Sequence, residues 1–199
     1  EICFIEMTRD ANFITYKDRD QETIRIDVDG TAEEYKILKV YQFTSDRKCM
    51  SVIVRRTGDN KLFSFVKGAD TAIMPALNNR GEWEEAVLAS MESYASTGLR
   101  TLLFSMKELT EGDVNGIDTL EDPSKFERAV TLLGTTGIED LLQDNVTKCI
   151  NDFKRAKCKV LMLTGDKGST AHSVGIACGL IDPQKQKVLY LKEVTTVAA

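Results

Sequence analysis

A tight β-hairpin is the feature that most limits what this chain can fold into. Residues 50–55 and 61–66 are rich in β-branched and aromatic side chains, and Gly58, Asp59 and Asn60 lie between them. Upstream, residues 12–16 and 23–28 alternate in side-chain type with period two, and residues 35–43 form a third strand candidate. Strands separated by short turns that contain glycine or aspartate predict an antiparallel sheet.

The segment after the hairpin mixes helix and strand. Residues 71–77 and 82–96 are predicted helices, the second of which ends at Gly98, and residues 99–105 return as a strand. Residues 108–122 are polar enough for a surface loop, and Pro123 begins a short helix.

The pattern changes from residue 132 onward. Apolar side chains between residues 138 and 153 form a helical stripe, residues 159–164 form an apolar strand, and residues 169–180 are helical again. This order predicts a parallel sheet with crossover helices. We therefore expect an α/β protein with an α+β domain over residues 1–132 and part of a second, α/β domain over residues 133–199.

Composition is typical of an ordinary globular protein. Of the 199 residues 42% are hydrophobic, and no apolar run approaches the roughly 20 residues that span a bilayer. The formal net charge of −5 argues against nucleic acid as a partner. Five cysteines without a Cys-x-x-Cys pair and a single His172 indicate free thiols in a reducing cytosol and no metal site.

Phe43 begins the strongest local motif. It ends a predicted strand and precedes Arg47 and Lys48 by four and five residues. An aromatic face can stack on adenine, which contributes about 1–3 kcal/mol in nucleic-acid sites, and the cations can meet a triphosphate. The alternative is a core phenylalanine beside a solvated turn, and the spacing alone leaves both open.

Two more cations stand at strand ends. Lys67 ends a strand and is followed by Gly68, which would let a ligand approach the backbone. Arg100 opens an apolar strand, and a guanidinium suits bidentate contact with phosphate oxygens. The alternatives are a surface lysine and an arginine paired with a surface carboxylate.

Thr164, Gly165 and Asp166 form a fourth motif between a predicted strand and a helix. Ligands bind at such strand ends in α/β sheets, where the helix N-terminus favours phosphate, although Gly and Asp also simply make turns. The chain has no Gly-x-x-x-x-Gly-Lys-Ser/Thr loop, which excludes a Walker-type phosphate site, and no Gly-x-Ser-x-Gly elbow for hydrolase chemistry.

The order of these motifs resembles the P-type ATPases over essentially the whole chain. The matching segments are residues 43–52, 67–69, 98–100, 132–134, 138–144 and 163–167. The last two, Ile138-Glu-Asp-x-Leu-Gln-Asp144 and Leu163-Thr-Gly-Asp-Lys167, are similar to the type IV members, the phospholipid flippases. Type II cation pumps usually have a proline in the first of these two segments and an asparagine after Thr-Gly-Asp.

The resemblance implies roles for individual residues. Phe43 would stack on adenine, Lys67 would line the nucleotide pocket and Arg100 would reach the phosphates. The other implied ATP-binding residues are Glu1, Ser45 and Lys48. The implied phosphate-proximal residues, in a haloacid-dehalogenase-like phosphorylation domain, are Asp140, Thr164, Gly165 and Asp166.

The resemblance also implies the activity of a longer protein. A type IV pump uses ATP and Mg²⁺ through an aspartyl-phosphate to move a phospholipid, with this region at the cytosolic face of a membrane and with room for an accessory subunit. The present sequence has no initiator methionine, no Asp-Lys-Thr-Gly and no Gly-Asp-Gly-x-Asn-Asp motif. We therefore expect a fragment that binds nucleotide and is catalytically incomplete.

Three alternatives stay open at this point. Transport assays on the complete protein would distinguish a type II cation pump from a phospholipid flippase. A non-catalytic regulatory domain would be rejected by an Asp-Lys-Thr-Gly motif upstream of Glu1 and by hydrophobic spans at both ends. A stand-alone phosphatase of the haloacid dehalogenase type would leave Phe43, Lys67 and Arg100 unexplained.

Titration of ATP into the isotope-labelled chain is predicted to shift the backbone amides around Phe43, Lys67 and Arg100. One stacked base and a few partly exposed charge contacts should net about 4–5 kcal/mol, which corresponds to a Kd near the millimolar range. We expect this binding to be largely independent of Mg²⁺. An amide spectrum that does not change at several millimolar ATP would contradict the prediction.

Overall fold

The computed structural model describes residues 2–139, 141–165 and 168–189, and the chain divides into two compact units. The first unit comprises Glu1–Met91 and Thr101–Thr136, and the second comprises Glu92–Arg100 and Gly137–Ala199. These two units have other bounds than the predicted domains, residues 1–132 and 133–199. The predicted domain assignment therefore stays a prediction. Across the described ranges, no helix combines the length and the apolar character that crossing a membrane requires.

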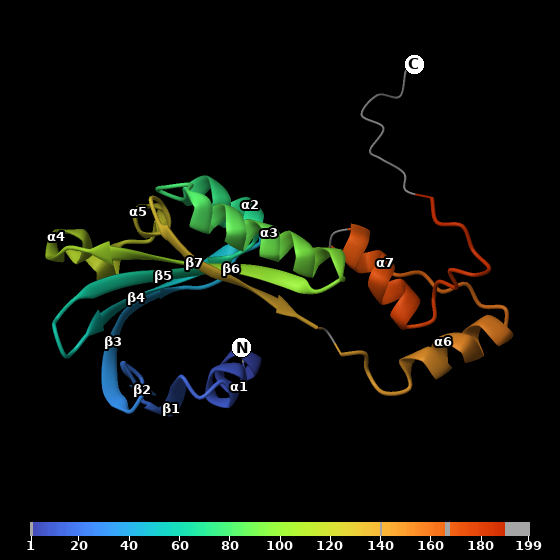
Figure 1. The fold of residues 1–199 in the computed structure, drawn as a ribbon, viewed down its shortest axis with the longest axis horizontal. Coiled ribbons are helices and arrows are strands. Elements are labelled where there is room, and N and C mark those ends of the chain that lie inside the picture. The colour runs from blue at the N-terminus through green and yellow to red at the C-terminus, as the bar shows by residue number, and fades with distance from the viewer. Residues whose placement is uncertain (1, 140, 166–167, 190–199) are drawn as a thin grey trace, which may run out of the picture. The chain divides into compact units, whose positions relative to one another are not determined.

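One seven-stranded sheet forms the first unit, with its strands side by side in chain order (Figure 1). The strands are β1 (Ile14–Arg19), β2 (Thr23–Val28), β3 (Thr31–Tyr41), β4 (Cys49–Arg56), β5 (Leu62–Gly68), β6 (Arg100–Leu109) and β7 (Thr131–Ile138). Each successive pair from β1 to β6 is antiparallel, which confirms the predicted sheet. Phe43 lies two residues beyond β3, although the strand was predicted to include it.

Turn residues set two of the hairpins. Asp29 and Gly30 both have positive φ, 49° and 78°, as the turn between β2 and β3 requires. Between β4 and β5 the Asp59 carboxylate pairs with the Arg56 side chain and also accepts a hydrogen bond from the Lys61 amide, and these contacts lower the pKa of Asp59 to about 2. The hairpin predicted from residues 50–55 and 61–66 is therefore present.

Helices cover one face of this sheet. They are α2 (Asp70–Ile73) with the short η1 (Met74–Ala76), the first part of α3 (Glu82–Ser96), and α5 (Ser124–Glu127), and α2, α3 and α5 lie on the same side in Figure 1. Two apolar clusters fill the space beneath them. One gathers Ile73, Met91 and Leu103, and the other surrounds Phe126, whose side chain is completely buried.

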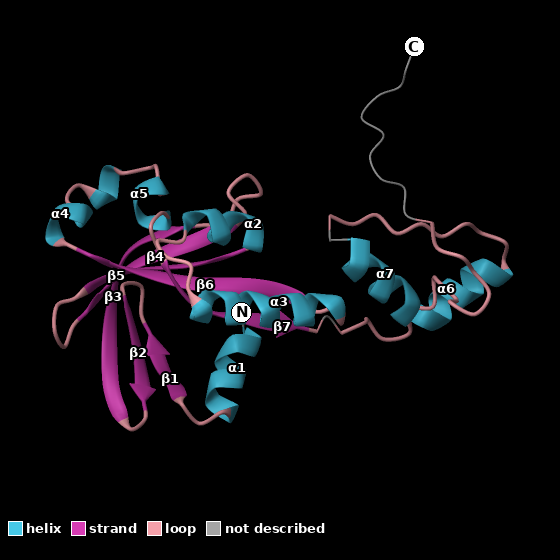
Figure 2. Ribbon diagram, turned by 45° about the horizontal axis from the view of Figure 1, so that its top comes forward, coloured by secondary structure: helices cyan, strands magenta, loops and turns pink. Residues whose placement is uncertain are grey.

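The opposite face of the sheet is concave. The strand register shifts between Tyr16 and Asp18 in β1 and between Ile37 and Lys39 in β3, and such bulges increase local twist. As a result β1–β3 run at an angle to β5 and β6, with α1 (Ile2–Asp10) beside β1 (Figure 2). The hollow that this curvature creates is where the candidate site lies.

The structure corrects the predicted elements at four places. Residues up to Ile138 belong to β7, so the helix expected from there, α6 (Val146–Arg155), begins later. The expected surface loop at 108–122 contains α4 (Glu111–Val114) and η2 (Ile117–Thr119), because buried Ile117 anchors it to the core. Helix α1 was not predicted, since none of its side chains is buried and it has no single apolar stripe.

The fourth correction concerns residues 159–164, which form no strand. A parallel strand needs hydrogen-bonding neighbours and cover on its faces, whereas Leu161 and Leu163 are 82% and 95% exposed. The described residues of the second unit offer no such neighbour, so the predicted parallel sheet is absent from them. Helix α7 (Gly168–Ala177) agrees with the predicted helix at 169–180.

Candidate nucleotide-binding site

A pocket of about 550 Å³ occupies the concave face of the sheet. Its walls come from all seven strands or from the loops beside them, and they are mainly apolar. The lining residues are Arg19, Ile24, Ile37, Val40, Gln42, Phe43, Met50, Ser51, Val52, Phe65, Val66, Lys67, Phe104, Ser105 and Leu133. A concave, largely apolar pocket of this size is typical of sites for small molecules.

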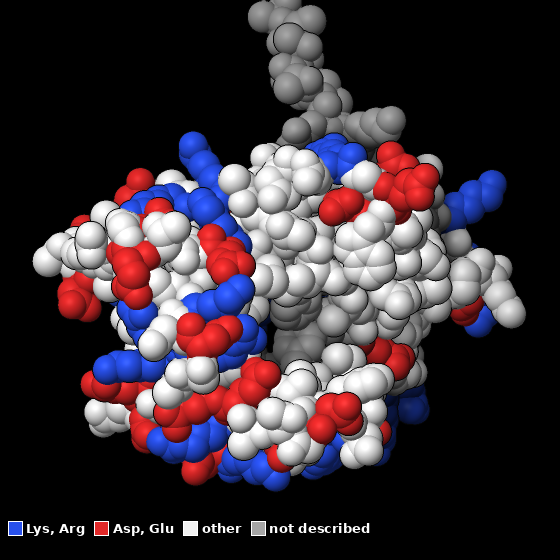
Figure 3. Space-filling view, turned by 60° about the vertical axis from the view of Figure 1, so that its left-hand side comes forward, with Lys and Arg blue, Asp and Glu red and all other residues white. Residues whose placement is uncertain are grey.

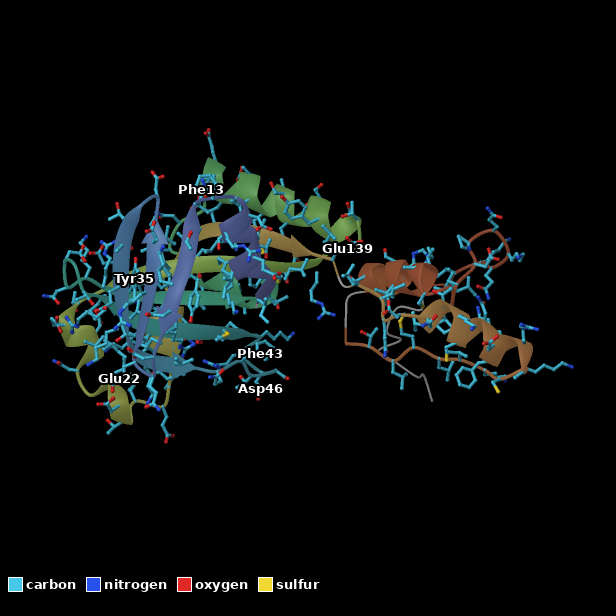
Figure 4. The ribbon with its side chains drawn as sticks, turned by 90° about the horizontal axis from the view of Figure 1, so that it is seen from below. Phe13, Glu22, Tyr35, Phe43, Asp46 and Glu139 are labelled. Carbon is cyan, nitrogen blue, oxygen red and sulfur yellow. The ribbon has the colours of Figure 1, made fainter. Side chains whose placement is uncertain are left out.

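Phe43 and Lys67 lie on this one pocket, although they come from separate sequence motifs. Phe43 belongs to the loop that follows β3, where Figure 4 shows it beside Asp46, and its side chain is 60% exposed. That exposure removes the alternative of a core phenylalanine. Lys67 is the penultimate residue of β5 and is half-buried.

Strand pairing determines what surrounds Lys67. Its pairing partners are Met50 on β4 and Phe104 on β6, so the three residues form a row across the sheet. Phe104 meets the ring of Phe4 edge-on at 5.4 Å, and the Lys67 ammonium lies 5.6 Å from the centre of the same Phe4 ring. A cation over an aromatic face is held electrostatically, so helix α1 helps to fix the lysine.

The charge of the lining favours an anion. Among its described residues Arg19 and Lys67 are positive and none is negative. Elsewhere Lys and Arg side chains are interspersed with Asp and Glu, as the face in Figure 3 shows. The positive charge of the pocket is therefore a local feature in a chain whose formal net charge is −5.

Gly68 serves strand packing. A Cβ atom added to it would lie 2.6 Å from Cβ of Cys49 and 2.7 Å from the backbone oxygen of Lys48. The sequence pattern predicts that this glycine lets a ligand approach the backbone, and that role stays a prediction. The structure shows that β4 approaches closely at Gly68, which only glycine permits.

The structure does not bring all the predicted site residues to this pocket. Ser45 and Lys48 are exposed in the turn after Phe43 and do not line it. Arg100, exposed at the start of β6, belongs to the second unit, as do Thr164 and Gly165, which precede α7. Three predicted residues, Glu1, Asp140 and Asp166, lie outside the described residues. The ligand contacts of all of these remain predictions.

Sequence reasoning missed several lining residues, of which Phe104 is the most informative. It is separated from Lys67 by 37 positions in the sequence, and only the pairing of β5 with β6 makes them neighbours. Phe65 and Arg19 were also missed. Alternation along β5 could have placed Phe65 on the face of Lys67, whereas no local signal identifies Arg19.

Comparison with known proteins identifies the family of the chain. The sequence model described as P-type ATPase, cytoplasmic domain N, matches residues 1–145. Because this match covers well over half of the chain, the chain belongs to the P-type ATPase family.

Individual relatives show which P-type ATPases the chain is similar to. The chain is 32% identical to phospholipid-transporting ATPase C887.12 of Schizosaccharomyces pombe, over 97% of this chain and 17% of the relative. It is 34% identical to phospholipid-transporting ATPase DRS2 of Saccharomyces cerevisiae, over 87% of the chain and 14% of the relative. It is 35% identical to human phospholipid-transporting ATPase IC, over 82% of the chain and 14% of the relative. The chain thus spans less than a fifth of these relatives.

The Cys49 thiol, on the opposite side of β4 from the pocket, is predicted to resist alkylation. Burial, together with the nearby Glu127 carboxylate, raises the pKa of this thiol to about 11, so the reactive thiolate is scarce at pH 8. Mass spectrometry after iodoacetamide treatment should find the exposed Cys3, Cys149 and Cys158 modified first. Cys49 should react once the protein is denatured; equal labelling in the folded state would contradict the prediction.

Proposed function

We propose that the pocket on the concave face binds ATP, with the adenine against Phe43 and the phosphates towards Lys67. The observation that carries this proposal is that an exposed aromatic ring and a lysine from separate motifs line one pocket. The ring offers a flat apolar face to a base, and Lys67 and Arg19 offer positive charge to phosphates. The family to which the chain belongs uses ATP.

The other predicted residues extend this proposal. Arg100 is proposed to reach the phosphates, Glu1 to contact the base, and Ser45 and Lys48 to border the bound nucleotide. Asp140, Thr164, Gly165 and Asp166 are proposed to lie near the transferred phosphoryl group. We place Mg²⁺ outside the pocket, because the described lining residues supply no carboxylate oxygen, which this ion prefers as a protein ligand.

In this mechanism the chain's own residues bind and orient the nucleotide. Stacking on Phe43 fixes the plane of the base, and the ammonium of Lys67, steadied by Phe4, attracts the phosphates. The phosphorylated aspartate would lie in an Asp-Lys-Thr-Gly motif, which these 199 residues do not contain. The chain would therefore present ATP to chemistry completed elsewhere in a longer protein.

Two substitutions should separate the base contact from the phosphate contact. Phe43→Ala removes stacking of about 1–3 kcal/mol and should weaken ATP and adenosine alike. Lys67→Gln should weaken ATP by about tenfold and leave adenosine unchanged, because only ATP carries phosphates. Amide-shift titrations measure both ligands, and Lys61→Gln, next to the start of β5, is the matched control. Equal loss of ATP and adenosine in Lys67→Gln would contradict the assignment.

We further propose that the full-length protein is an integral-membrane phospholipid-transporting ATPase, with this region at the cytosolic face of the membrane. The support is that the similar proteins above bear that name, and that residues 138–144 and 163–167 resemble type IV segments. A type II cation pump and a non-catalytic regulatory domain are less favoured for the same reasons. An accessory subunit fits this proposal but has no support from these residues.

Full-length protein reconstituted into vesicles should move a fluorescent phospholipid between leaflets when ATP is added. The Phe43→Ala variant should lose most of this movement at low ATP and recover part of it at high ATP, because the change weakens nucleotide binding. The assay is quenching of the fluorophore in the outer leaflet. ATP-driven cation flux without lipid movement would instead favour the type II pump.

A further inference from the structure

The Glu127 carboxylate is an almost buried charge behind the pocket. It lies at the end of α5, on the helix-covered face of the sheet, and its side chain is 11% exposed. One oxygen accepts hydrogen bonds from Arg47 and from the Ser51 hydroxyl, each at 2.7 Å. The Cys49 thiol lies 3.5 Å from the other oxygen. Buried carboxylates need such donors, because an unpaired charge away from water is costly.

Arg47 connects this carboxylate to the loop that carries Phe43. Its guanidinium donates to the backbone oxygen of Gln42 and to the Thr44 hydroxyl, the latter at 3.3 Å. Gln42 and Thr44 are the two neighbours of Phe43 in the chain. The rigid fork of an arginine side chain can satisfy several acceptors in one geometry, so a single group fastens both sides of Phe43.

Phe43 depends on these backbone and side-chain contacts of its neighbours to hold its position. Its own side chain is 60% exposed, so packing in the free protein does little to fix it. The loop of residues 42–48 also contains Lys48 with φ of 53°, whose amide donates to the Thr44 oxygen at 2.8 Å. A stacking platform contributes most when it is held in place before the ligand arrives, because less freedom is then lost on binding.

We propose that Glu127 is a positioning residue that holds the Phe43 platform in place through Arg47. The proposal rests on the proposed function, because Phe43 matters as a platform only if a base binds there. Glu127 contacts no ligand in this scheme, since it lies on the other face of the sheet from the concave pocket. Its effect should therefore be selective for the base and weak for the phosphates.

The test uses Glu127→Gln and Arg47→Lys in the 199-residue chain. The first variant removes the charge that orients the guanidinium, and the second removes the fork that reaches Gln42, Thr44 and Glu127 together. The matched control is Glu108→Gln, because Glu108 forms an ion pair with Lys61 at 3.0 Å while 57% of its side chain is exposed. Surface pairs of this kind contribute little to stability.

Three quantities are measured for each variant by NMR: backbone order parameters at Phe43 and Lys48, adenosine affinity and tripolyphosphate affinity. We expect the order parameters to fall from about 0.85 towards about 0.6 in both variants. Adenosine affinity should fall by about three- to tenfold, with tripolyphosphate affinity and the control unchanged. If Glu127→Gln does not fold, the Arg47→Lys variant alone tests the positioning role.

Each outcome has a separate meaning. Unchanged order parameters in the folded variants overturn the positioning role, whatever the wild type does with adenosine. An equal loss for adenosine and tripolyphosphate, with a lower melting temperature, also overturns it, because the role would then be structural only. Failure of the wild-type chain to bind adenosine at all, with the order parameters falling as expected, counts against the proposed function and leaves the loop contact established.

Discussion

The pairing of β4 with β5 is the contact on which the candidate site depends. It sets Met50 opposite Lys67 and Cys49 opposite Gly68, so that Lys67 points to the concave face one residue before the strands close together. At Gly68 there is no room for a side chain between the two backbones. A larger residue would push β4 and β5 apart where the Phe43 loop ends, and both the lysine and the loop would lose their geometry.

The two faces of the sheet differ in what covers them. One face is covered by α2, α3 and α5 and contains fully buried Ile53 and Leu103. The other is left open by the curvature of β1–β3, and a ligand can reach it (Figure 2). Because side chains alternate along each strand, one backbone supports a rigid core and an accessible pocket at once. Glu127 and Arg47 connect the two, since the carboxylate lies on the covered face and the arginine on the loop.

The predictable parts of the fold are those with local signals. Hairpin turns at Asp29 and Gly30 and at Asp59 and Asn60 require particular backbone conformations, and the structure has them. Helix α3 followed from its apolar spacing. In contrast, residues 159–164 have an apolar run typical of a strand, yet no described neighbour pairs with them. Strand propensity becomes a strand only when a partner supplies hydrogen bonds, and a local pattern contains no information about the partner.

For the site, the sequence by itself determined which chemical groups are available: Phe43 shortly before two cations, Lys67 before a glycine, and the ordered motifs of a P-type ATPase. Only the tertiary structure decided that Phe43 and Lys67 share one pocket, that Phe104 stands beside the lysine and that Glu127 reaches Arg47 across 80 positions. The reason is physical. Side-chain type and turn chemistry act over a few residues, whereas strand register and sheet curvature bring distant residues together.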